Sequence, residues 1–143
     1  PMKVLITRLD KDIPLPNFAR AGDAGADIVS RIDIDIAPGE RALVPTGISI
    51  ALPDGYAAFA HPRSGLAIKY GVGMVNAPGT VDAGFRGELQ CIMINHDPEH
   101  DYQVQRGDRI AQLIVQAIAN VEWSPVAELD DNDRGGGFGH SGR

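Results

Sequence analysis

Ile32-Asp33-Ile34-Asp35-Ile36 is the stretch that decides the fold, because apolar and acidic residues alternate in it without a break. Successive side chains of a β-strand point to opposite faces, so this pattern buries the isoleucines on one face and leaves the aspartates in solvent. Ala37-Pro38-Gly39-Glu40 follows directly, and its proline and glycine are typical of a tight turn. Residues 32–40 therefore predict a half-buried strand that ends in a turn.

Apolar stretches of similar length extend along the rest of the 143-residue chain. We expect further strands at residues 2–9, 43–52, 56–60, 88–94 and 110–118. Pro45 and Gly47 mark bends or a sheet edge inside the second of these. Turn signals recur about every ten residues, which is typical of a β-sandwich or barrel. Only residues 64–70 favour a helix, of at most two turns, so the chain is predicted to be one all-β domain with at most one short helix.

Charge and cysteine content narrow the class of function. A formal net charge of −6 at pH 7 argues against nucleic acid as a partner, because non-specific binding needs a basic face. An anionic small molecule would need cations gathered locally, or a metal ion. Cys91, the only cysteine, lies in an apolar run and is expected in the core, and a single thiol favours a reducing compartment. No stretch is apolar enough to span a membrane and no signal peptide opens the sequence, so we expect a cytoplasmic protein without a membrane partner.

Two segments could hold an anion. At Arg63-Ser64-Gly65 the start of the short helix would offer unpaired N–H groups beside a hydroxyl and a guanidinium. The alternative is a serine that caps the helix next to a solvated arginine. Residues 134–142 are rich in glycine around Phe138, and such a backbone can wrap phosphate oxygens with successive N–H groups. The alternative for this segment is a frayed chain terminus.

Two other segments could contact a small molecule. Residues 76–87 place glycines and a proline around Asp82, so a hairpin here could bring bare backbone groups to a flat base. The alternative is a loop whose aspartate makes a local turn hydrogen bond. Residues 106–112 lead into a strand, where Asp108 is expected to pair with a nearby arginine and Gln112 could reach a polar ligand. The alternative there is a plain turn that enters a strand.

Taken in order, these segments resemble the motifs of the trimeric dUTPase family. The five motifs of the family correspond to residues 21–27, 62–67, 76–87, 106–112 and 134–142. The match covers the whole chain, and its details are most similar to actinobacterial members. The resemblance implies that residues 1–133 form a β jelly-roll, which assembles into a homotrimer with three active sites between subunits. It also implies that residues 134–143 form an arm that closes a site made by other chains.

The reaction implied by the resemblance is hydrolysis of the substrate dUTP to dUMP and pyrophosphate with Mg²⁺ as cofactor. Asp82 would be catalytic, since it would orient the water that attacks the α-phosphate. Asp27 would contact the magnesium shell through water, while the substrate phosphates hold the ion itself. The substrate-binding residues implied in this way are Arg63, Ser64, Gly65, Asn76, Thr80, Val81, Asp82, Phe85, Gln90, Gln112, Arg134, Phe138, His140 and Ser141.

The same resemblance divides these residues by role. The third motif would read the uracil edge, mainly through backbone groups, and its Phe85 would lie beneath the deoxyribose. The second and fourth motifs would hold phosphates. In the arm, Phe138 would stack on uracil, Arg134 would meet the γ-phosphate, and the residues at 140 and 141 would lie near the phosphates.

The sequence departs from the family pattern at two places. Phe85 stands where the family usually has tyrosine, and the arm runs from Arg134 to Phe138 with one residue fewer than usual. Two alternative functions stay open beside dUTP hydrolysis. One is a dCTP deaminase of the same superfamily, against which the complete third motif and the arm argue. The other is a noncatalytic, nucleotide-sensing trimer, against which the presence of Asp82 argues.

Overall fold

Eleven strands and one short helix make up the regular structure of residues 1–130, the part of the chain that the computed structural model describes. In chain order the elements are β1 (Leu5–Arg8), β2 (Ala26–Val29), β3 (Ile34–Ile36), β4 (Arg41–Pro45), β5 (Ile48–Ala51), β6 (Tyr56–Pro62), α1 (Ser64–Tyr70), β7 (Val72–Met74), β8 (Gly79–Val81), β9 (Gln90–Asn95), β10 (Tyr102–Val104) and β11 (Arg109–Ala117). The prediction of an all-β chain with one short helix is confirmed.

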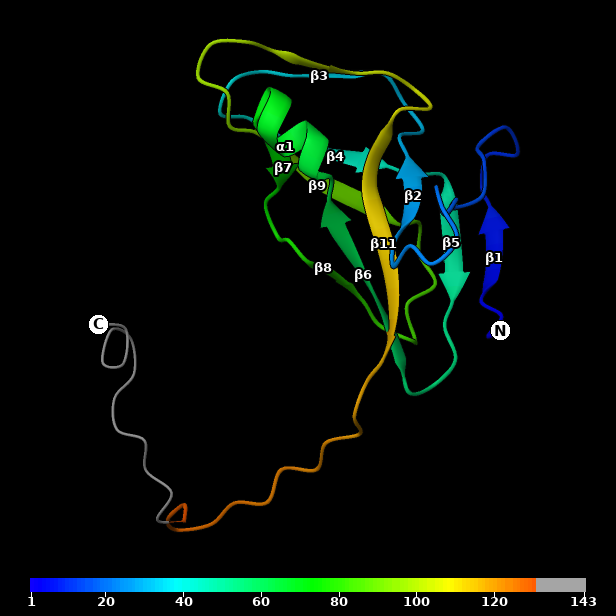
Figure 1. Cartoon of the computed structure of the whole chain (residues 1–143), viewed down its shortest axis with the longest axis vertical. Coiled ribbons are helices and arrows are strands. Elements are labelled where there is room, and N and C mark those ends of the chain that lie inside the picture. The colour runs from blue at the N-terminus through cyan, green and yellow to red at the C-terminus, as the bar shows by residue number, and fades with distance from the viewer. Residues whose placement is uncertain (131–143) are drawn as a thin grey trace.

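The strands form two larger and two smaller antiparallel sheets. The first large sheet has the order β2-β11-β6-β8 and the second has the order β4-β9-β7, while β1 pairs with β5 and β3 with β10. Figure 1 shows α1 beside β7 and β9, and the long β11 crossing in front of them. Because buried residues of both large sheets belong to one apolar cluster, the core lies between the sheets as in a β-sandwich.

The strict alternation at residues 32–36 correctly identified which face is buried. Ile36 is 1% exposed, Ile34 is half-buried, and Asp35 between them is exposed. The predicted strand at residues 43–52 instead forms two strands, β4 and β5. Gly47 separates them with a φ of +76°, a left-handed conformation that glycine adopts without steric cost. The bend expected at this glycine is therefore confirmed.

Four strands were not predicted. All residues of β2 are buried, so its sequence shows no alternation, and β7, β8 and β10 are each three residues long. A pattern of period two cannot be recognised over so few residues. These omissions matter because β2 and β8 carry residues of the candidate site.

The segment after β11 leaves the sheets. Figure 1 shows residues 118–130, in orange, running away from the domain. Trp123 is 88% exposed and Leu129 is 87% exposed, so large apolar side chains of this segment have no cover within the described part of the chain. Such exposed apolar groups indicate that the segment packs against another surface. In residues 1–130 no helix has the length and apolar character needed to cross a membrane.

Asn95 should be a main polar anchor of the fold, because it is fully buried and its side chain ties the end of β3 to the loop between β9 and β10. Its Nδ2 donates to the carbonyls of Ile36 (2.9 Å) and His100 (2.8 Å), and its Oδ1 accepts from the N–H of Asp97 (2.9 Å). Asn95→Ala leaves these buried backbone groups without hydrogen-bond partners, so we expect a loss of about 3 kcal/mol in the free energy of unfolding.

Urea unfolding at one fixed protein concentration measures this loss. The matched control is Asn120→Ala, an exposed site that should change the free energy by no more than about 0.5 kcal/mol. Equal effects of the two substitutions would contradict the role assigned to Asn95.

Candidate functional site

A pocket of about 260 Å³ lies beside β8 and β9 and is bounded by the loop that joins them. Ile28, Leu89 and Leu113, all buried, form part of its apolar wall. The predicted substrate-binding residues that line it are Asn76, Thr80, Val81, Asp82, Phe85 and Gln90. The structure therefore brings all the expected residues of the third motif to one cavity.

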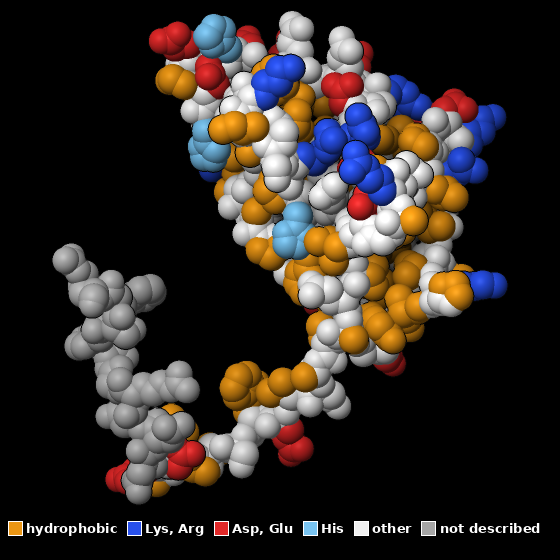
Figure 2. All heavy atoms as spheres, viewed as in Figure 1, with side chains coloured by type: hydrophobic (Ala, Val, Ile, Leu, Met, Phe, Trp, Pro, Cys, Tyr) orange, Lys and Arg blue, Asp and Glu red, His pale blue; other side chains and the backbone are white. Residues whose placement is uncertain are grey.

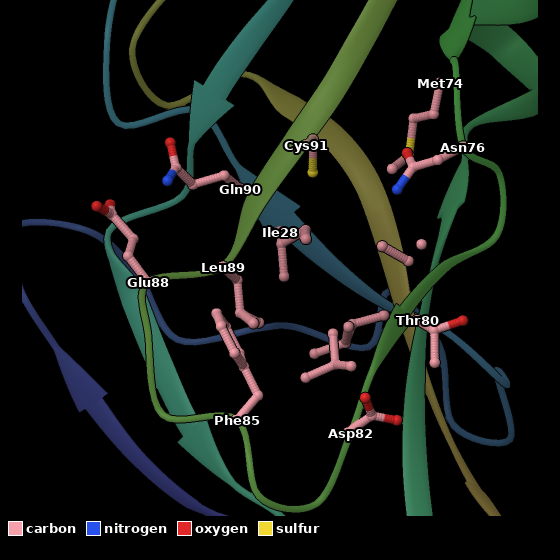
Figure 3. Close-up of a pocket in the computed structure, with 14 residues that line it drawn as sticks. Ile28, Met74, Asn76, Thr80, Asp82, Phe85, Glu88, Leu89, Gln90 and Cys91 are labelled. Atoms are coloured by element: carbon pink, nitrogen blue, oxygen red, sulfur yellow. The ribbon is translucent and has the colours of Figure 1, made fainter.

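Asp82 and Phe85 occupy the two ends of one turn. The N–H of Phe85 donates to the backbone carbonyl of Asp82 (3.1 Å), and Arg86 donates to the carbonyls of Ala83 and Phe85. Figure 3 shows Asp82 and Phe85 on opposite sides of the pocket. No group within residues 1–130 hydrogen bonds to the Asp82 carboxylate, so the alternative of a local side-chain turn bond is not found. The carboxylate is exposed and able to accept from water or a ligand.

Gly87 fixes the space available to the Phe85 ring. A Cβ at position 87 would lie 2.7 Å from Cζ of Phe85, closer than side chains approach one another. Only glycine at this position leaves the ring where it lies, at the edge of the pocket.

The expected hairpin at residues 76–87 is wrong in detail. Strand β8 pairs with β6, with Val81 opposite Ala58, whereas β9 pairs with β4 and β7. Residues 82–89 therefore cross from one sheet of the sandwich to the other, because the next strand of the chain belongs to the opposite layer. Within the described residues, β8 is the last strand of its sheet, so the backbone groups along its outer edge are free to pair with a ligand.

A second polar cluster surrounds Asp27, which is 6% exposed on β2. Its Oδ1 lies 3.6 Å from Nε of Arg63 and 3.5 Å from the donor Nε2 of Gln112. Its Oδ2 lies 3.9 Å from Nη1 of Arg109. A buried carboxylate is costly unless cations or donors compensate it, and here two arginines and an amide do so. The first, second and fourth motifs thus meet at Asp27.

Arg109 was not predicted as a site residue. Residues 109 and 112 are three apart, and a regular strand would direct them to opposite faces. The register of β11 against β2 shifts between Arg109 and Ala111, as in a β-bulge, and this shift brings both side chains to Asp27. No periodicity in the sequence could have indicated it.

Two smaller expectations at these motifs need correction. Asp108 does not pair with an arginine in the described residues; its Oδ2 accepts from the N–H of Gln105 (2.8 Å), which closes the turn before β11. Ser64 does not cap α1, because the cap is Arg63 and makes no side-chain capping bond. Ser64 is exposed beside Gly65, so both remain available to a ligand.

Asp27 and the β8 end of the pocket are well separated within one chain, although Ile28 and Leu113, next to Asp27 and Gln112 in sequence, line the pocket. Asp27 pairs with Gln112, which pairs with His61 on β6, whereas Val81 pairs with Ala58. Three residues along β6 and three strand spacings across the sheet give a separation of about 17 Å between the backbones of Asp27 and Val81. One small ligand therefore does not contact Asp82 and Arg63 of the same chain at once.

Comparison with known proteins gives the family. The family model described as dUTPase matches residues 11–142. The deoxyuridine 5'-triphosphate nucleotidohydrolase of Streptomyces griseus is 57% identical over 143 residues, which cover 99% of this chain and 81% of the relative. The chain belongs to the dUTPase family. The expected resemblance to actinobacterial dUTPases is confirmed.

Solved dUTPase structures have the same fold. A variant of the dUTPase of Staphylococcus bacteriophage 80alpha, solved with dUpNHpp, has a TM-score of 0.86 and 28% identity, over 98% of this chain and 99% of that one. A variant of the dUTPase of phage phi11 of S. aureus, described with a structural Mg(II) ion, has a TM-score of 0.82 and 24% identity, over 89% of this chain and 98% of that one. The expected jelly-roll of the dUTPase family is confirmed.

The site residues expected in the dUTPase arm are Arg134, Phe138, His140 and Ser141, and all four lie outside the described residues. Of the remaining expected residues, Ser64 and Gly65 lie at the start of α1 next to Arg63, and the others line the pocket or belong to the Asp27 cluster. Cys91, expected in the core, is 1% exposed, and burial raises the pKa of its thiol to about 12. This thiol is therefore protonated at neutral pH, which excludes it as a nucleophile of this dUTPase.

Proposed function

We propose that the chain hydrolyses dUTP to dUMP and pyrophosphate, with a water held by Asp82 attacking the α-phosphate. The observation that carries this proposal is the Asp82 carboxylate, which is exposed and without a hydrogen-bond partner in the described residues at the rim of an apolar-walled pocket. A carboxylate in this position can accept a hydrogen bond from water and hold it in line. The family membership of the chain supports the same reaction.

The pocket supplies recognition of the base and sugar. The free edge of β8 presents the backbone donors and acceptors of alternate residues, which distinguish uracil from cytosine by the reversed pattern of its edge. Asn76 and Gln90 line the same cavity and assist. The Phe85 ring lies beneath the deoxyribose, where a 2′-hydroxyl would collide with it. Phenylalanine keeps the apolar surface of the usual tyrosine and loses only the phenol.

The Asp27 cluster supplies the phosphate contacts. Arg63 and Gln112 bind phosphate oxygens together with Ser64 and Gly65 at the start of α1. A guanidinium matches phosphate geometry with two parallel hydrogen bonds, which makes arginine well suited to this task. Asp27 holds Arg63 and Gln112 in position, because its oxygens already contact both.

The donor set fits a magnesium ion that arrives on the substrate. Residues 1–130 contain no group of three acidic, histidine or cysteine side chains that could form a protein-only cage. Mg²⁺ commonly keeps several waters and takes its remaining ligands from substrate phosphates and one or two carboxylates. Asp27, with loose contacts of 3.5 to 3.9 Å, would meet such an ion through water. When bound, the ion neutralises phosphate charge and fixes the triphosphate geometry.

The separation between the two clusters supports a site shared between chains. A water on Asp82 must reach the phosphate that it attacks, whereas the Asp27 cluster that binds phosphates lies across the sheet from Asp82 in the same chain. A closed homotrimer solves this by placing the pocket of one chain against the Asp27 cluster of the next. In sequence, residues 134–143 follow the segment that leaves the domain, and we infer that they serve as the arm of a neighbouring site. We also place the protein in the cytoplasm, which the unpaired thiol of Cys91 supports.

Asp82 acts mainly by orientation. It holds the attacking water and accepts the proton only late in the attack. The freed proton passes from the attacking water to this carboxylate as the bond between the α- and β-phosphates breaks.

The decisive experiment measures pyrophosphate release from dUTP, dCTP, dTTP and UTP in the presence of Mg²⁺. Release from dUTP alone supports the proposal. Release of ammonia from dCTP would instead identify a deaminase, and binding of dUTP without turnover would identify a nucleotide sensor.

Asp82→Asn should retain the fold and dUTP binding but lose most turnover, since an amide cannot accept the proton and orients water differently. We expect kcat to fall by about 10²–10⁴, with the Kd for dUTP within a few-fold of the original value. Steady-state kinetics and calorimetry measure the two quantities. A kcat close to that of the unchanged protein would show that Asp82 does not hold the water.

Phe85→Ala should weaken discrimination between dUTP and UTP, because the ring fills the space that a 2′-hydroxyl would need. We expect the ratio of kcat/KM for the two nucleotides to fall by at least about tenfold. Phe85→Tyr is the matched control and should leave this ratio nearly unchanged. If alanine leaves the ratio unchanged as well, the ring does not lie under the sugar.

Mixing two inactive variants tests the shared site. Removal of residues 134–143 and Asp82→Asn should each abolish most activity, because each deletes one part that a different chain supplies. When the two proteins are unfolded together and refolded, about a quarter of sites should receive both parts by random assortment in a closed ring. Recovered activity measures this fraction. Mixed trimers, proved by mass spectrometry, without recovered activity would mean that the arm acts within its own chain or not at all.

A further inference from the structure

Glu88 places a second carboxylate on the wall of the pocket. Among the described residues that line the cavity, Asp82 and Glu88 are the acidic ones. Figure 3 shows Glu88 across the pocket from Asp82, with its carboxylate directed away from the cavity. Phe85 and Leu89 belong to the same wall. The direction of the Glu88 side chain therefore decides how much negative charge this wall presents to an anionic ligand.

Two donors hold the Glu88 carboxylate away from the cavity. The N–H of Gly47 donates to Oε2 at 2.8 Å, and Nη1 of Arg31 lies 3.2 Å from Oε2 and 3.4 Å from Oε1. The neighbouring backbone is fixed as well, since the N–H of Leu89 donates to the carbonyl of Ile48 (2.9 Å). The side chain of Glu88 is 20% exposed, so it is partly removed from solvent screening.

Arg31 is itself held in place by a chain of contacts. Its N–H donates to the carbonyl of Pro45 (2.8 Å), and its own carbonyl accepts from Nη1 of Arg106 (2.8 Å). Its Nε lies 3.8 Å from Oδ2 of Asp10, which also accepts from Arg106 at 2.7 Å. The hydrogen bond from Arg106 holds the pKa of Asp10 below its usual value, so this carboxylate stays charged and keeps both arginines oriented.

We propose that Arg31 is a positioning residue for substrate binding: it neutralises Glu88 and keeps that carboxylate turned out of the pocket. The inference rests on the proposed function, because the charge of Glu88 matters only if the ligand is anionic. Without Arg31 the carboxylate keeps one donor, Gly47, and can rotate toward the nucleotide. A free negative charge there repels a triphosphate in the ground state and in the transition state alike, so it raises KM and leaves kcat largely intact.

The stability effect of the same change is small. The side chain of Arg31 is 35% exposed, and ion pairs at such sites contribute little to folding. We therefore expect Arg31→Ala to shift Tm by no more than about 4 °C. A loss of substrate affinity would then not be a consequence of a damaged fold.

The experiment compares Arg31→Ala, Glu88→Gln and the double variant. We expect Arg31→Ala to raise KM for dUTP and Kd for dUpNHpp by about tenfold, with kcat within about threefold. Glu88→Gln keeps an oxygen for the N–H of Gly47 and loses the charge, so its KM should match that of the unchanged protein. In the double variant, removal of the carboxylate charge should bring KM back to within about threefold of the original value.

Salt and conservative substitution separate charge from packing. The KM ratio between Arg31→Ala and the unchanged protein should shrink as KCl rises from about 0.05 M to about 0.5 M, because salt screens the repulsion. Arg31→Lys should retain most of the affinity, since it keeps the positive charge. Arg8→Ala is the matched control, because within residues 1–130 the Arg8 side chain hydrogen bonds only to the carbonyl of Ile13 (3.4 Å), and it should leave KM unchanged.

Three results would overturn the inference. They are an unchanged KM in Arg31→Ala, an increase in KM that Glu88→Gln does not suppress, and a KM increase that does not depend on salt. Turnover by the unchanged protein separates these from failure of the proposed function. No hydrolysis of dUTP refutes the function, whereas hydrolysis with any of the three results refutes only the role of Arg31.

Discussion

Strand β11 is the element on which both halves of the candidate site depend. It pairs with β2 along one edge and with β6 along the other, and its Ile110 and Ala111 are fully buried in the core. Through β2 it positions Asp27, and through β6 it carries β8 and the pocket at the far side of the sheet. The register shift near Arg109 then brings the side chain of Arg109 to the buried carboxylate of Asp27. A single strand thus sets the spacing between the Asp27 cluster and the pocket.

Local pattern predicted the fold class well and the individual strands unevenly. The alternation at residues 32–36 identified its buried face because five residues of period two leave no other interpretation. Strand β2 was not predicted because burial on both faces removes the alternation of apolar and polar residues. Strands β7 and β8 were not predicted because three residues are too few to show such an alternation. The bend at Gly47 was expected. However, the ability of glycine to adopt a left-handed conformation does not indicate whether the chain bends within one strand or starts a new strand.

The candidate site was predicted by resemblance more than by chemistry. The motifs named Asp82, Phe85 and the second-motif arginine, and the structure brings the third-motif residues to one cavity. They did not reveal that the two groups are far apart in one chain, because distance across a sheet depends on strand order. They also did not indicate a role for Arg109, whose position depends on a register shift. Nor did they indicate a role for Glu88, whose position depends on its contact with Arg31, 57 residues away in sequence.

The exposed edge of β8 has a consequence for solubility. An unpaired strand edge can recruit a strand from another molecule, and such pairing is a common route to aggregation. Here the edge is only three residues long and is followed directly by the charged Asp82. Too few backbone groups are available for a stable intermolecular ladder, and the charge opposes its extension. A short edge of this kind leaves backbone groups open to a small ligand but is too short to pair stably with a polypeptide strand.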